Sequence, residues 1–232
     1  MERIKIAALG DSITKGVVLT KENNYSVLEE SFVEILKTEQ NLDIDNYGRF
    51  GCTINYGHQI IDRHPEYISS SEYTILEYGG NDCDFHWKRI ALDPSAEHKP
   101  KTALNPFREL FVALINKVKA LGSKPIILSL PPINSTSYFE FFSRGMDSVQ
   151  KDNILGWMGG EVEAIARWHE DYNRVLFDVA NQTGTTILDI TQPFNAYPTD
   201  WRSLICPDGI HPNSAGHRLI ASAIMTATRF GS

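Results

Sequence analysis

The chain alternates short apolar stretches with longer amphipathic ones along its whole length, and this alternation limits the fold more than any other feature. The short stretches are rich in β-branched or aromatic residues and end at Gly, Asn or Pro, as buried strands do. They span residues 3–9, 42–47, 73–78, 125–130 and 185–190. The longer stretches, residues 26–37, 106–121, 161–183 and 214–230, keep apolar residues at roughly helical spacing. The pattern predicts an α/β protein with a parallel sheet and crossover helices on both faces.

The length of 232 residues fits one large domain, and we expect a single domain over residues 1–232. No internal repeat, low-complexity tract or linker rich in Pro, Gly or Ser separates two units. Two connections, residues 83–105 and 131–160, are longer than usual, and long loops on a compact domain often form lids or binding walls. We expect both to be loop insertions beside a functional site.

Charge and composition exclude several classes of protein. The formal net charge is −7 without a cluster of Lys or Arg, which argues against nucleic acid and anionic membranes as partners. The first apolar stretch is too short for a secretory signal or a membrane span, so we expect a cytoplasmic protein without stable membrane insertion. The three cysteines, Cys52, Cys83 and Cys206, are an odd number and form no Cys-x-x-Cys pair, which argues against a disulfide framework.

Polar residues capable of chemistry follow the predicted strands at the point where each strand ends. Ser12 follows the first strand, Gly51 the second and Asn81 the third, while Asp208 and His211 lie in the loop before the last helix. Ligands of open parallel sheets bind at the carboxyl ends of the strands, where the strand order reverses. We therefore expect these five residues to share one edge of the sheet.

Ser12, Asp208 and His211 are the residue types that serine acyl transfer requires. A serine hydroxyl needs a base that titrates near neutrality, and that base needs a carboxylate to orient it and to stabilise its charged form. His211 suits the first task, and Asp208, three positions earlier, suits the second. The other histidines compared have no acidic residue at this offset, and ordinary surface or core positions suit them: His58, His64, His98, His169 and His217.

Acyl transfer also needs hydrogen-bond donors for the oxygen that becomes negative in the tetrahedral intermediate. The Asn81 amide, with the backbone N–H groups of Gly51 and Ser12, could provide this oxyanion hole. Taken singly, each of the three positions reads as a turn or a helix cap, since Gly10-Asp11-Ser12 and Gly79-Gly80-Asn81-Asp82 are rich in turn formers. Their occurrence together at one edge favours the catalytic interpretation.

The four sequence blocks around Ser12, Gly51, Asn81 and His211 resemble those of the SGNH hydrolases, also called GDSL-type lipases and esterases. The resemblance covers Gly10 to His217 and departs from the family motif where Ile13 replaces its leucine. It implies Ser12 as nucleophile, Asp208 and His211 as its triad partners, and an oxyanion hole of Ser12, Gly51 and Asn81. It also implies a flavodoxin-like, three-layer α/β/α fold around a mainly five-stranded parallel sheet, and no cofactor.

Aromatic residues in the long connections are candidates for the walls of a binding pocket. Trp87, Phe141, Phe142 and Trp157 could line such a pocket or pack down as a small subdomain. The segment Asp82-Cys83-Asp84-Phe85-His86 offers possible metal ligands, but a solvated loop explains the same alternation, and we expect no metal site. The three cysteines are expected to be packing residues.

We therefore expect a serine ester hydrolase that acts on short acyl esters of small molecules, with a carbohydrate acetyl ester favoured over a long-chain lipid. The alternative within the same chemistry is a lipase or lysophospholipase-type acylhydrolase, for which no long apolar lid is visible. Two other classes remain open on the residues alone. The segment Gly10–Gly16 could cradle the phosphate of a flavin, and Asp11, Asn81, Asp82 and His211 could serve a metal-dependent phosphoesterase. The sequence does not predict the oligomeric state.

Overall fold

The computed structural model describes residues 3–228 and residue 230. Its centre is a parallel sheet of five strands in the order β4-β1-β5-β6-β7. The strands are β1 (Lys5–Gly10), β4 (Asp43–Asn46), β5 (Tyr73–Glu77), β6 (Lys124–Leu128) and β7 (Thr186–Leu188). All five lie within two residues of the predicted stretches at either end, so the expected α/β fold with a parallel sheet is confirmed.

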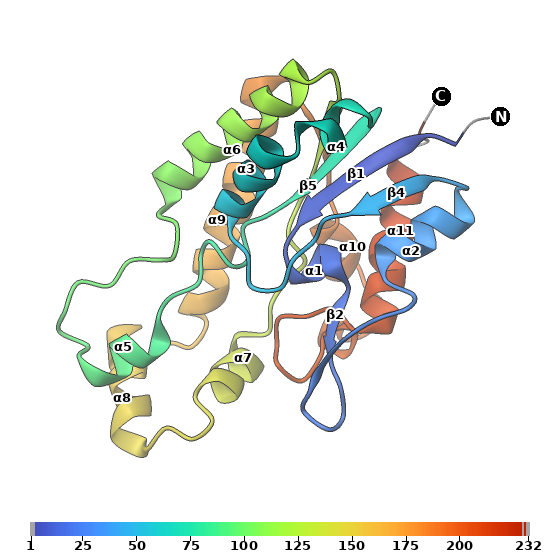
Figure 1. Cartoon of the computed structure of the whole chain (residues 1–232). Helices are drawn as coiled ribbons and strands as arrows, with labels where there is room; N and C mark the ends of the chain where they lie inside the picture. Colours follow the sequence, from blue (N-terminus) through green and yellow to red (C-terminus); the bar gives the residue numbers. More distant parts are fainter. Residues whose placement is uncertain (1–2, 229, 231–232) are drawn as a thin grey trace.

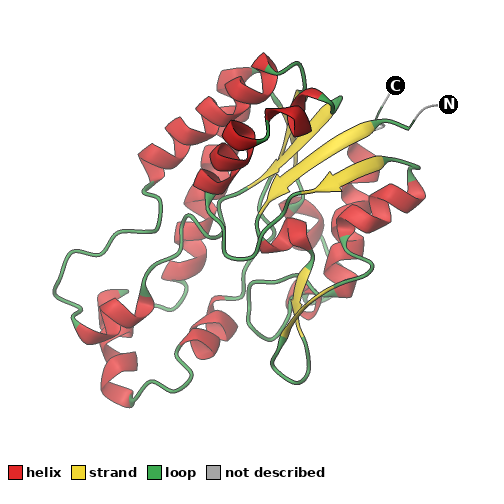
Figure 2. Ribbon diagram, in the orientation of Figure 1, coloured by secondary structure: helices red, strands yellow, loops and turns green. Residues whose placement is uncertain are grey.

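Helices cover both faces of the sheet, as Figures 1 and 2 show. One face carries α3 (Ile54–Arg63), α4 (Pro65–Ser69), α6 (Leu104–Ala120) and α9 (Ala164–Thr183), and the other carries α2 (Phe32–Glu39), α10 (Thr191–Asn195) and α11 (Ser214–Ala227). Along β1, Ile6 and Ala8 are buried under the second group, while Ala7 and Leu9 are buried under the first. This alternation follows from the period of two in a strand, and it makes the three-layer α/β/α arrangement.

The segment after β1 differs from the prediction. We expected a helix over residues 26–37, but Tyr25–Val27 is strand β3, which pairs antiparallel with β2 (Val17–Leu19) in a small hairpin. Helix α2 begins only at Phe32, where the Ser31 hydroxyl accepts a hydrogen bond from the N–H of Glu34 and caps the helix. The apolar spacing of residues 32–36 is therefore helical, while the residues before them form the hairpin.

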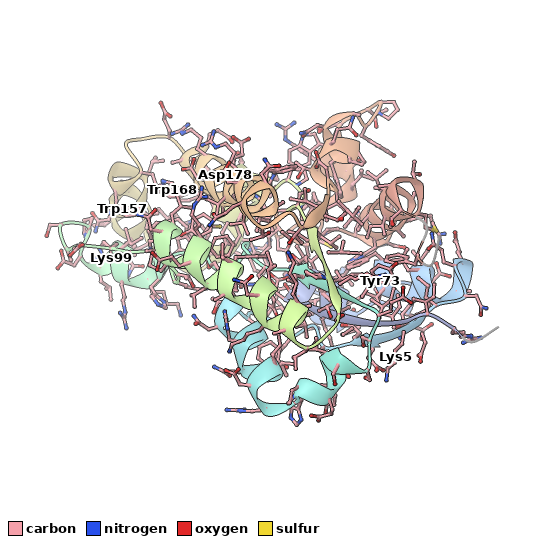
Figure 3. All side chains as sticks on the ribbon, turned by 90° about the horizontal axis from the view of Figure 1, so that it is seen from above. Lys5, Tyr73, Lys99, Trp157, Trp168 and Asp178 are labelled. Atoms are coloured by element: carbon pink, nitrogen blue, oxygen red, sulfur yellow. The ribbon has the colours of Figure 1, made fainter. Side chains whose placement is uncertain are left out.

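The two long connections are not plain loops. They hold α5 (Trp87–Leu92), α7 (Ser135–Phe142) and α8 (Ser148–Trp157), which pack together and against the start of α9 around a separate apolar cluster. Seen from above in Figure 3, Trp157 and Trp168 of this cluster lie at the end of the molecule opposite Lys5 and Tyr73, where β1 and β5 begin. We call α5, α7 and α8 the cap helices, because they lie beyond the carboxyl ends of the strands.

The remaining elements are short. A single helical turn, α1 (Ser12–Lys15), follows β1, and a 3-10 helix (Trp201–Leu204) precedes the loop that leads to α11. Among the helices of the described residues, none is both long enough and apolar enough to cross a membrane.

Candidate active site

Ser12 lies where β1 ends and α1 begins, at the edge of the sheet that the sequence predicted. The Asp11 carboxylate accepts a hydrogen bond from the N–H of Ile13 and caps the turn, so that Ser12 is held at its first position. Gly10 is required for this close passage, because a Cβ there would lie 2.0 Å from the Thr14 hydroxyl oxygen. The Ser12 side chain is largely buried but borders a cavity.

Ser12, His211 and Asp208 form a continuous hydrogen-bonded chain. The distance from Ser12 Oγ to His211 Nε2 is 2.9 Å, and that from His211 Nδ1 to Asp208 Oδ2 is 2.6 Å. With the ring proton on Nδ1 facing the carboxylate, Nε2 is left to accept the proton of the serine hydroxyl. The arrangement has the geometry that activation of a serine nucleophile requires.

The loop that carries the last two residues is tightly folded. Asp208 Oδ1 accepts hydrogen bonds from the N–H groups of Ile210 and His211, both at 3.1 Å, which fixes the carboxylate toward the ring. Gly209 has a φ of 80°, and a Cβ there would lie 2.5 Å from backbone atoms of Asn134 and Tyr138. Burial alone would raise the pKa of Asp208, but hydrogen bonds and attraction to the His211 ring hold that pKa below its ordinary value.

Two aromatic rings that the sequence reasoning missed surround the imidazole of His211. Phe50 stacks on it with ring centroids 5.9 Å apart, and Tyr25 meets it edge-on at 5.3 Å. Burial, together with the charge of Asp208, raises the pKa of Tyr25, so its hydroxyl stays neutral beside the carboxylate. The position of Phe50 next to Gly51 could have indicated a place in the site. Nothing in the sequence indicated such a place for Tyr25, because its hairpin was not predicted.

Asn81 and Gly51 border the same cavity as Ser12 and His211. Gly51 lies in an exposed turn with a φ of 73°, a backbone region that favours glycine. Asn81 follows β5, and its Nδ2 donates one hydrogen bond of 2.9 Å to Asp11 Oδ2. The amide has a second N–H on the same nitrogen, which is left to donate into the cavity.

Asp11 and Glu77 form a pair of buried carboxyl groups beneath this site. Asp11 is 1% exposed and Glu77 is fully buried, and Glu77 Oε2 accepts hydrogen bonds from the N–H and the hydroxyl of Thr14. Burial and the nearby charge of Asp11 raise the pKa of Glu77 well above its ordinary value, so we assign the proton of the pair to Glu77. Burial also raises the pKa of Asp11, although the bonds from Ile13 and Asn81 oppose that rise.

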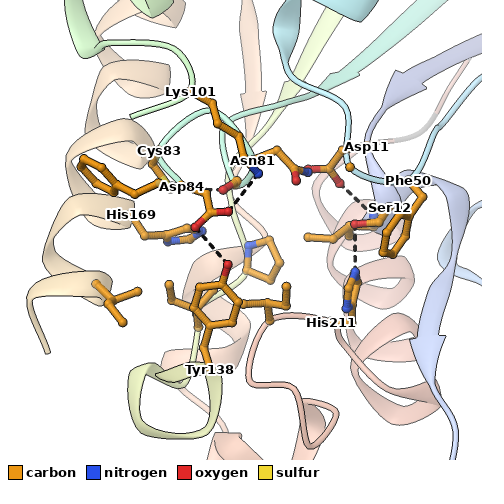
Figure 4. Close-up of a pocket in the computed structure, with 18 of the residues that line it drawn as sticks. Asp11, Ser12, Phe50, Asn81, Cys83, Asp84, Lys101, Tyr138, His169 and His211 are labelled. Atoms are coloured by element: carbon orange, nitrogen blue, oxygen red, sulfur yellow. Dashed lines mark hydrogen bonds and ion pairs between the residues drawn. The ribbon is translucent and has the colours of Figure 1, made fainter. Parts of the chain in front are cut away.

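The cavity has a volume of about 220 Å³ and extends from Ser12 and His211 to the cap helices. In Figure 4, Ser12 and His211 lie on one side of it, Asn81 lies above its middle, and His169 and Cys83 lie on the opposite side. Its far part is lined mainly by apolar and aromatic side chains, which are Phe85, Trp87, Ile133, Tyr138, Ile165 and Trp168.

The structure separates the four aromatic candidates for the pocket wall. Trp87 lines the cavity. Phe142 and Trp157 do not; Phe142 stacks on Trp87 with centroids 4.4 Å apart, and Trp157 packs beside it, so both support the wall from behind. Phe141 also lies outside the cavity, beside the hairpin, where it meets the Tyr25 ring. Of the two roles expected for these aromatic residues, Trp87 has that of a pocket wall, while Phe142 and Trp157 belong to the small packed unit behind it.

The two aspartates that follow Asn81, Asp82 and Asp84, form hydrogen bonds that hold neighbouring segments together. Asp84 accepts hydrogen bonds from Trp87 Nε1 at 2.8 Å, from the Tyr138 hydroxyl at 2.9 Å and from Lys101 Nζ at 2.9 Å, and so joins the two long connections. Asp82 turns toward the N–H of Ile54, at 3.2 Å from both its oxygens. Within residues 3–228 and 230, no three His, Cys, Asp or Glu side chains gather as metal ligands would.

Comparison with known proteins gives a consistent result. The model of the GDSL-like lipase/acylhydrolase family matches residues 8–219. A curated relative, the uncharacterized lipoprotein YqeF of Bacillus subtilis, is 26% identical over 94% of this chain and 87% of its own length.

Solved structures show the same fold. A lipase/acylhydrolase from Enterococcus faecalis superimposes with a TM-score of 0.67 at 17% identity, over 97% of this chain and 94% of that one. A catalytic mutant of Axe2, an acetylxylan esterase from Geobacillus stearothermophilus, superimposes with a TM-score of 0.64 at 19% identity, over 96% of this chain and 93% of that one. These likenesses support the predicted fold, with its five-stranded parallel sheet.

Proposed function

This chain belongs to the GDSL-like lipase/acylhydrolase family and is a carboxylic ester hydrolase, and we propose that Ser12, His211 and Asp208 are its catalytic triad. The observation that carries the proposal is the hydrogen-bonded chain from Ser12 Oγ through His211 to Asp208, with distances of 2.9 and 2.6 Å. The catalytic mutants of Axe2 replace a serine, an aspartate and a histidine, and that aspartate also lies three positions before the histidine. The correspondence of residue types supports the same assignment here.

The proposed reaction has two stages. Ser12 Oγ attacks the ester carbonyl carbon while His211 Nε2 takes the hydroxyl proton, and the alcohol leaves with that proton as the acyl-serine forms. Water then attacks the acyl carbon, His211 takes a proton from the water, and the carboxylic acid departs as Ser12 regains its hydrogen. Asp208 stabilises the imidazolium in both stages without itself being protonated.

We assign the oxyanion hole to the Asn81 amide and the backbone N–H groups of Gly51 and Ser12. Support comes from their place around one cavity and from the bond between Asn81 and Asp11, which leaves one N–H of the amide unused. Donors fixed in this way stabilise the negative oxygen of the tetrahedral intermediate without reorganising during the reaction.

The substrate class that we propose is a short acyl ester of a small hydroxylated molecule, with an acetylated carbohydrate as the leading example. A cavity of about 220 Å³ lies below the range of roughly 300–1,000 Å³ that is usual for drug-sized ligands. Its aromatic lining suits the faces of sugar rings. The acetylxylan esterase activity in the name of Axe2 belongs to that protein, and here it supports the choice of probes.

A long-chain acylhydrolase is the second candidate, and the family name includes lipases. The aromatic residues of the cap helices face their own cluster, except for Phe141, which packs beside the hairpin. Leu92 and Val149 are the large apolar side chains that these helices expose among the described residues. This distribution favours a structural cap over an apolar surface that adsorbs to lipid. Rates on esters of increasing chain length separate the two candidates.

The test compares wild type and Ser12→Ala on 4-nitrophenyl esters from acetate to palmitate and on acetylated xylose. We expect wild type to prefer the shortest esters and to release acetate from the sugar, and Ser12→Ala to lose roughly 10⁵-fold or more in kcat. Covalent labelling of wild type, but not of Ser12→Ala, by a fluorophosphonate is the matching readout by mass spectrometry. Full activity of Ser12→Ala would contradict the triad, and activity lost to a metal chelator would favour the phosphoesterase alternative.

The location of the protein in the cell stays a prediction. We infer a cytoplasmic site from the sequence, whereas the relative in Bacillus subtilis is named a lipoprotein, which would place an enzyme of this kind at a membrane surface. Fractionation of cells that produce the native protein, followed by detection in the soluble and membrane fractions, decides between them.

A further inference from the structure

His169, on α9, is a buried polar side chain without a hydrogen-bond partner. Its residue is 6% exposed, and its imidazole makes no hydrogen bond or ion pair with any residue within 3–228 or with residue 230. Buried polar groups in folded proteins nearly always have partners, because losing water without replacement costs free energy. Neither ring nitrogen of His169 is among the fully buried, unpartnered polar atoms of the described residues, so the imidazole keeps access to the cavities that it lines, and a ligand there can supply the missing partner.

His169 lies between two cavities. On one side it lines the catalytic cavity, and on the other it lines a neighbouring polar cavity of about 260 Å³, whose wall includes Asn134, Glu170, Asn173 and Arg202. A neutral imidazole has one donor and one acceptor nitrogen. Water in the polar cavity can serve one of them, and Figure 4 shows the ring beside the catalytic cavity, across from Ser12 and His211.

Two of the polar groups around the far part of the catalytic cavity, Tyr138 and Lys101, are paired with a third, Asp84. The Tyr138 hydroxyl donates to Asp84, and Lys101 forms an ion pair with the same carboxylate at 2.9 Å. The side chains between them and His169 are apolar or aromatic. Among the described residues of this region, the His169 imidazole and the Trp168 indole N–H have no protein partner and can bond to a substrate, and of the two only the imidazole can accept a hydrogen bond as well as donate one.

We propose that His169 is a substrate-binding residue, which forms a hydrogen bond with a hydroxyl or ring oxygen on the part of the substrate that enters the far end of the catalytic cavity. This inference rests on the proposed function, and it narrows the substrate class to neutral, hydroxylated esters. Burial lowers the pKa of His169 to about 4, so the ring is uncharged at neutral pH. It would select against an anionic substrate, since the cation that lines this cavity, Lys101, is already paired with Asp84.

The experiment measures the preference for a hydroxyl group with two matched pairs of esters. Cyclohexyl acetate and trans-4-hydroxycyclohexyl acetate place the hydroxyl on the alcohol, while 4-nitrophenyl butanoate and 4-nitrophenyl 3-hydroxybutanoate place it on the acyl group. We expect wild type to prefer the hydroxylated member of at least one pair by about tenfold in kcat/KM, the value of one good hydrogen bond.

The variants are His169→Phe, His169→Leu and His169→Gln, with His58→Phe as matched control. We expect the preference to fall to about one in the Phe and Leu variants and to persist in part in the Gln variant, which keeps a donor and an acceptor. His58 is a half-buried histidine on α3 outside the cavity, where it contacts the Leu110 carbonyl at 3.0 Å, so its variant should keep the wild-type preference.

Each outcome decides the inference. A wild-type enzyme that hydrolyses esters without preferring either hydroxylated substrate overturns it, and this measurement does not depend on the folding of any variant. A preference that survives unchanged in His169→Phe or His169→Leu overturns it as well. Failure of wild type to hydrolyse any of the four esters contradicts the proposed function itself, and the inference with it.

Discussion

Replacing Asp11 with Asn should slow catalysis without unfolding the protein, because Asp11 acts through Asn81. In wild type, Asp11 Oδ1 accepts from the N–H of Ile13 and Oδ2 accepts from Asn81 Nδ2, both at 2.9 Å. The amide of the Asp11→Asn variant has one oxygen and one NH2 group, so one of these two donors must face another donor. If its oxygen stays with Ile13, the NH2 group meets the Asn81 amide and turns it away from the cavity.

The magnitude follows from the loss of one oxyanion donor. Such a loss costs roughly 10²- to 10³-fold in kcat, and we expect little change in KM because the donor acts mainly in the transition state. The free energy of unfolding should change by no more than about 1–2 kcal/mol at pH 7. One hydrogen bond is lost, but a buried charge beside Glu77 is removed at the same time, and the two effects oppose each other.

The assay is a double-mutant cycle of Asp11→Asn, Asn81→Ala and the combined variant on 4-nitrophenyl acetate, with urea unfolding as the stability control. If Asp11 acts only by orienting Asn81, the combined variant is no slower than Asn81→Ala alone. Losses that multiply in the combined variant, or a full kcat in Asp11→Asn, would refute the argument.

Three further predictions follow from the site. In Asp208→Asn, the N–H groups that bind Oδ1 should hold the oxygen of the new amide, so that the NH2 group of this amide faces His211 Nδ1 and imposes the wrong tautomer on the ring. Steady-state kinetics should show a kcat lower by about 10⁴-fold, and a loss of kcat below tenfold would contradict the role of Asp208. Burial raises the pKa of Asp82 from 3.8 to about 7, so unfolding free energy should fall by up to about 4 kcal/mol between pH 4 and 7. Urea titrations should find a flatter profile in Asp82→Asn, and identical profiles would exclude Asp82 as the cause. Burial also raises the pKa of the Cys83 thiol beside the cavity, so iodoacetamide should inactivate the enzyme slowly at pH 7.5, and the Cys83→Ser variant should resist this inactivation. Unchanged activity after complete modification of Cys83 would show that the thiol does not border the substrate.

The sheet could be predicted from the sequence because each of its strands is a local pattern. A strand buried on both faces needs a short continuous apolar run, and residues such as Ile6, Leu76 and Ile127 give that signal without reference to distant segments. The hairpin gave too short a signal, since β2 is an apolar run of three residues and the three residues of β3 are all exposed. The cap helices were missed because most of their aromatic residues pack on each other, and Phe141 packs beside the hairpin, so that none of them marks a helix that covers the sheet.

The candidate triad could also be predicted, because two of its members lie in one short loop and the third directly follows a strand. The supporting residues could not. Asp11 reads as a turn former, and its bond to Asn81 joins positions 70 residues apart. Tyr25 and Phe50 meet the His211 ring only because the hairpin and the loop after β4 come together at the same edge. Spacing along the chain carries no information about such contacts.

The reacting groups and the far part of the cavity are built from different elements of the fold, and this affects specificity. The proposed reaction needs only the edge of the sheet, where Ser12, Asn81 and His211 are positioned by β1, β5 and the loop before α11. The far part of the cavity is built instead by the cap helices and the start of α9, which are joined to each other through Asp84 and stacked aromatic rings. Because the two parts rest on different elements, residues such as Trp87 and His169 can change the substrate without disturbing the triad. Substitutions in the far part should therefore alter the ranking of esters more than the rate on the smallest one, 4-nitrophenyl acetate.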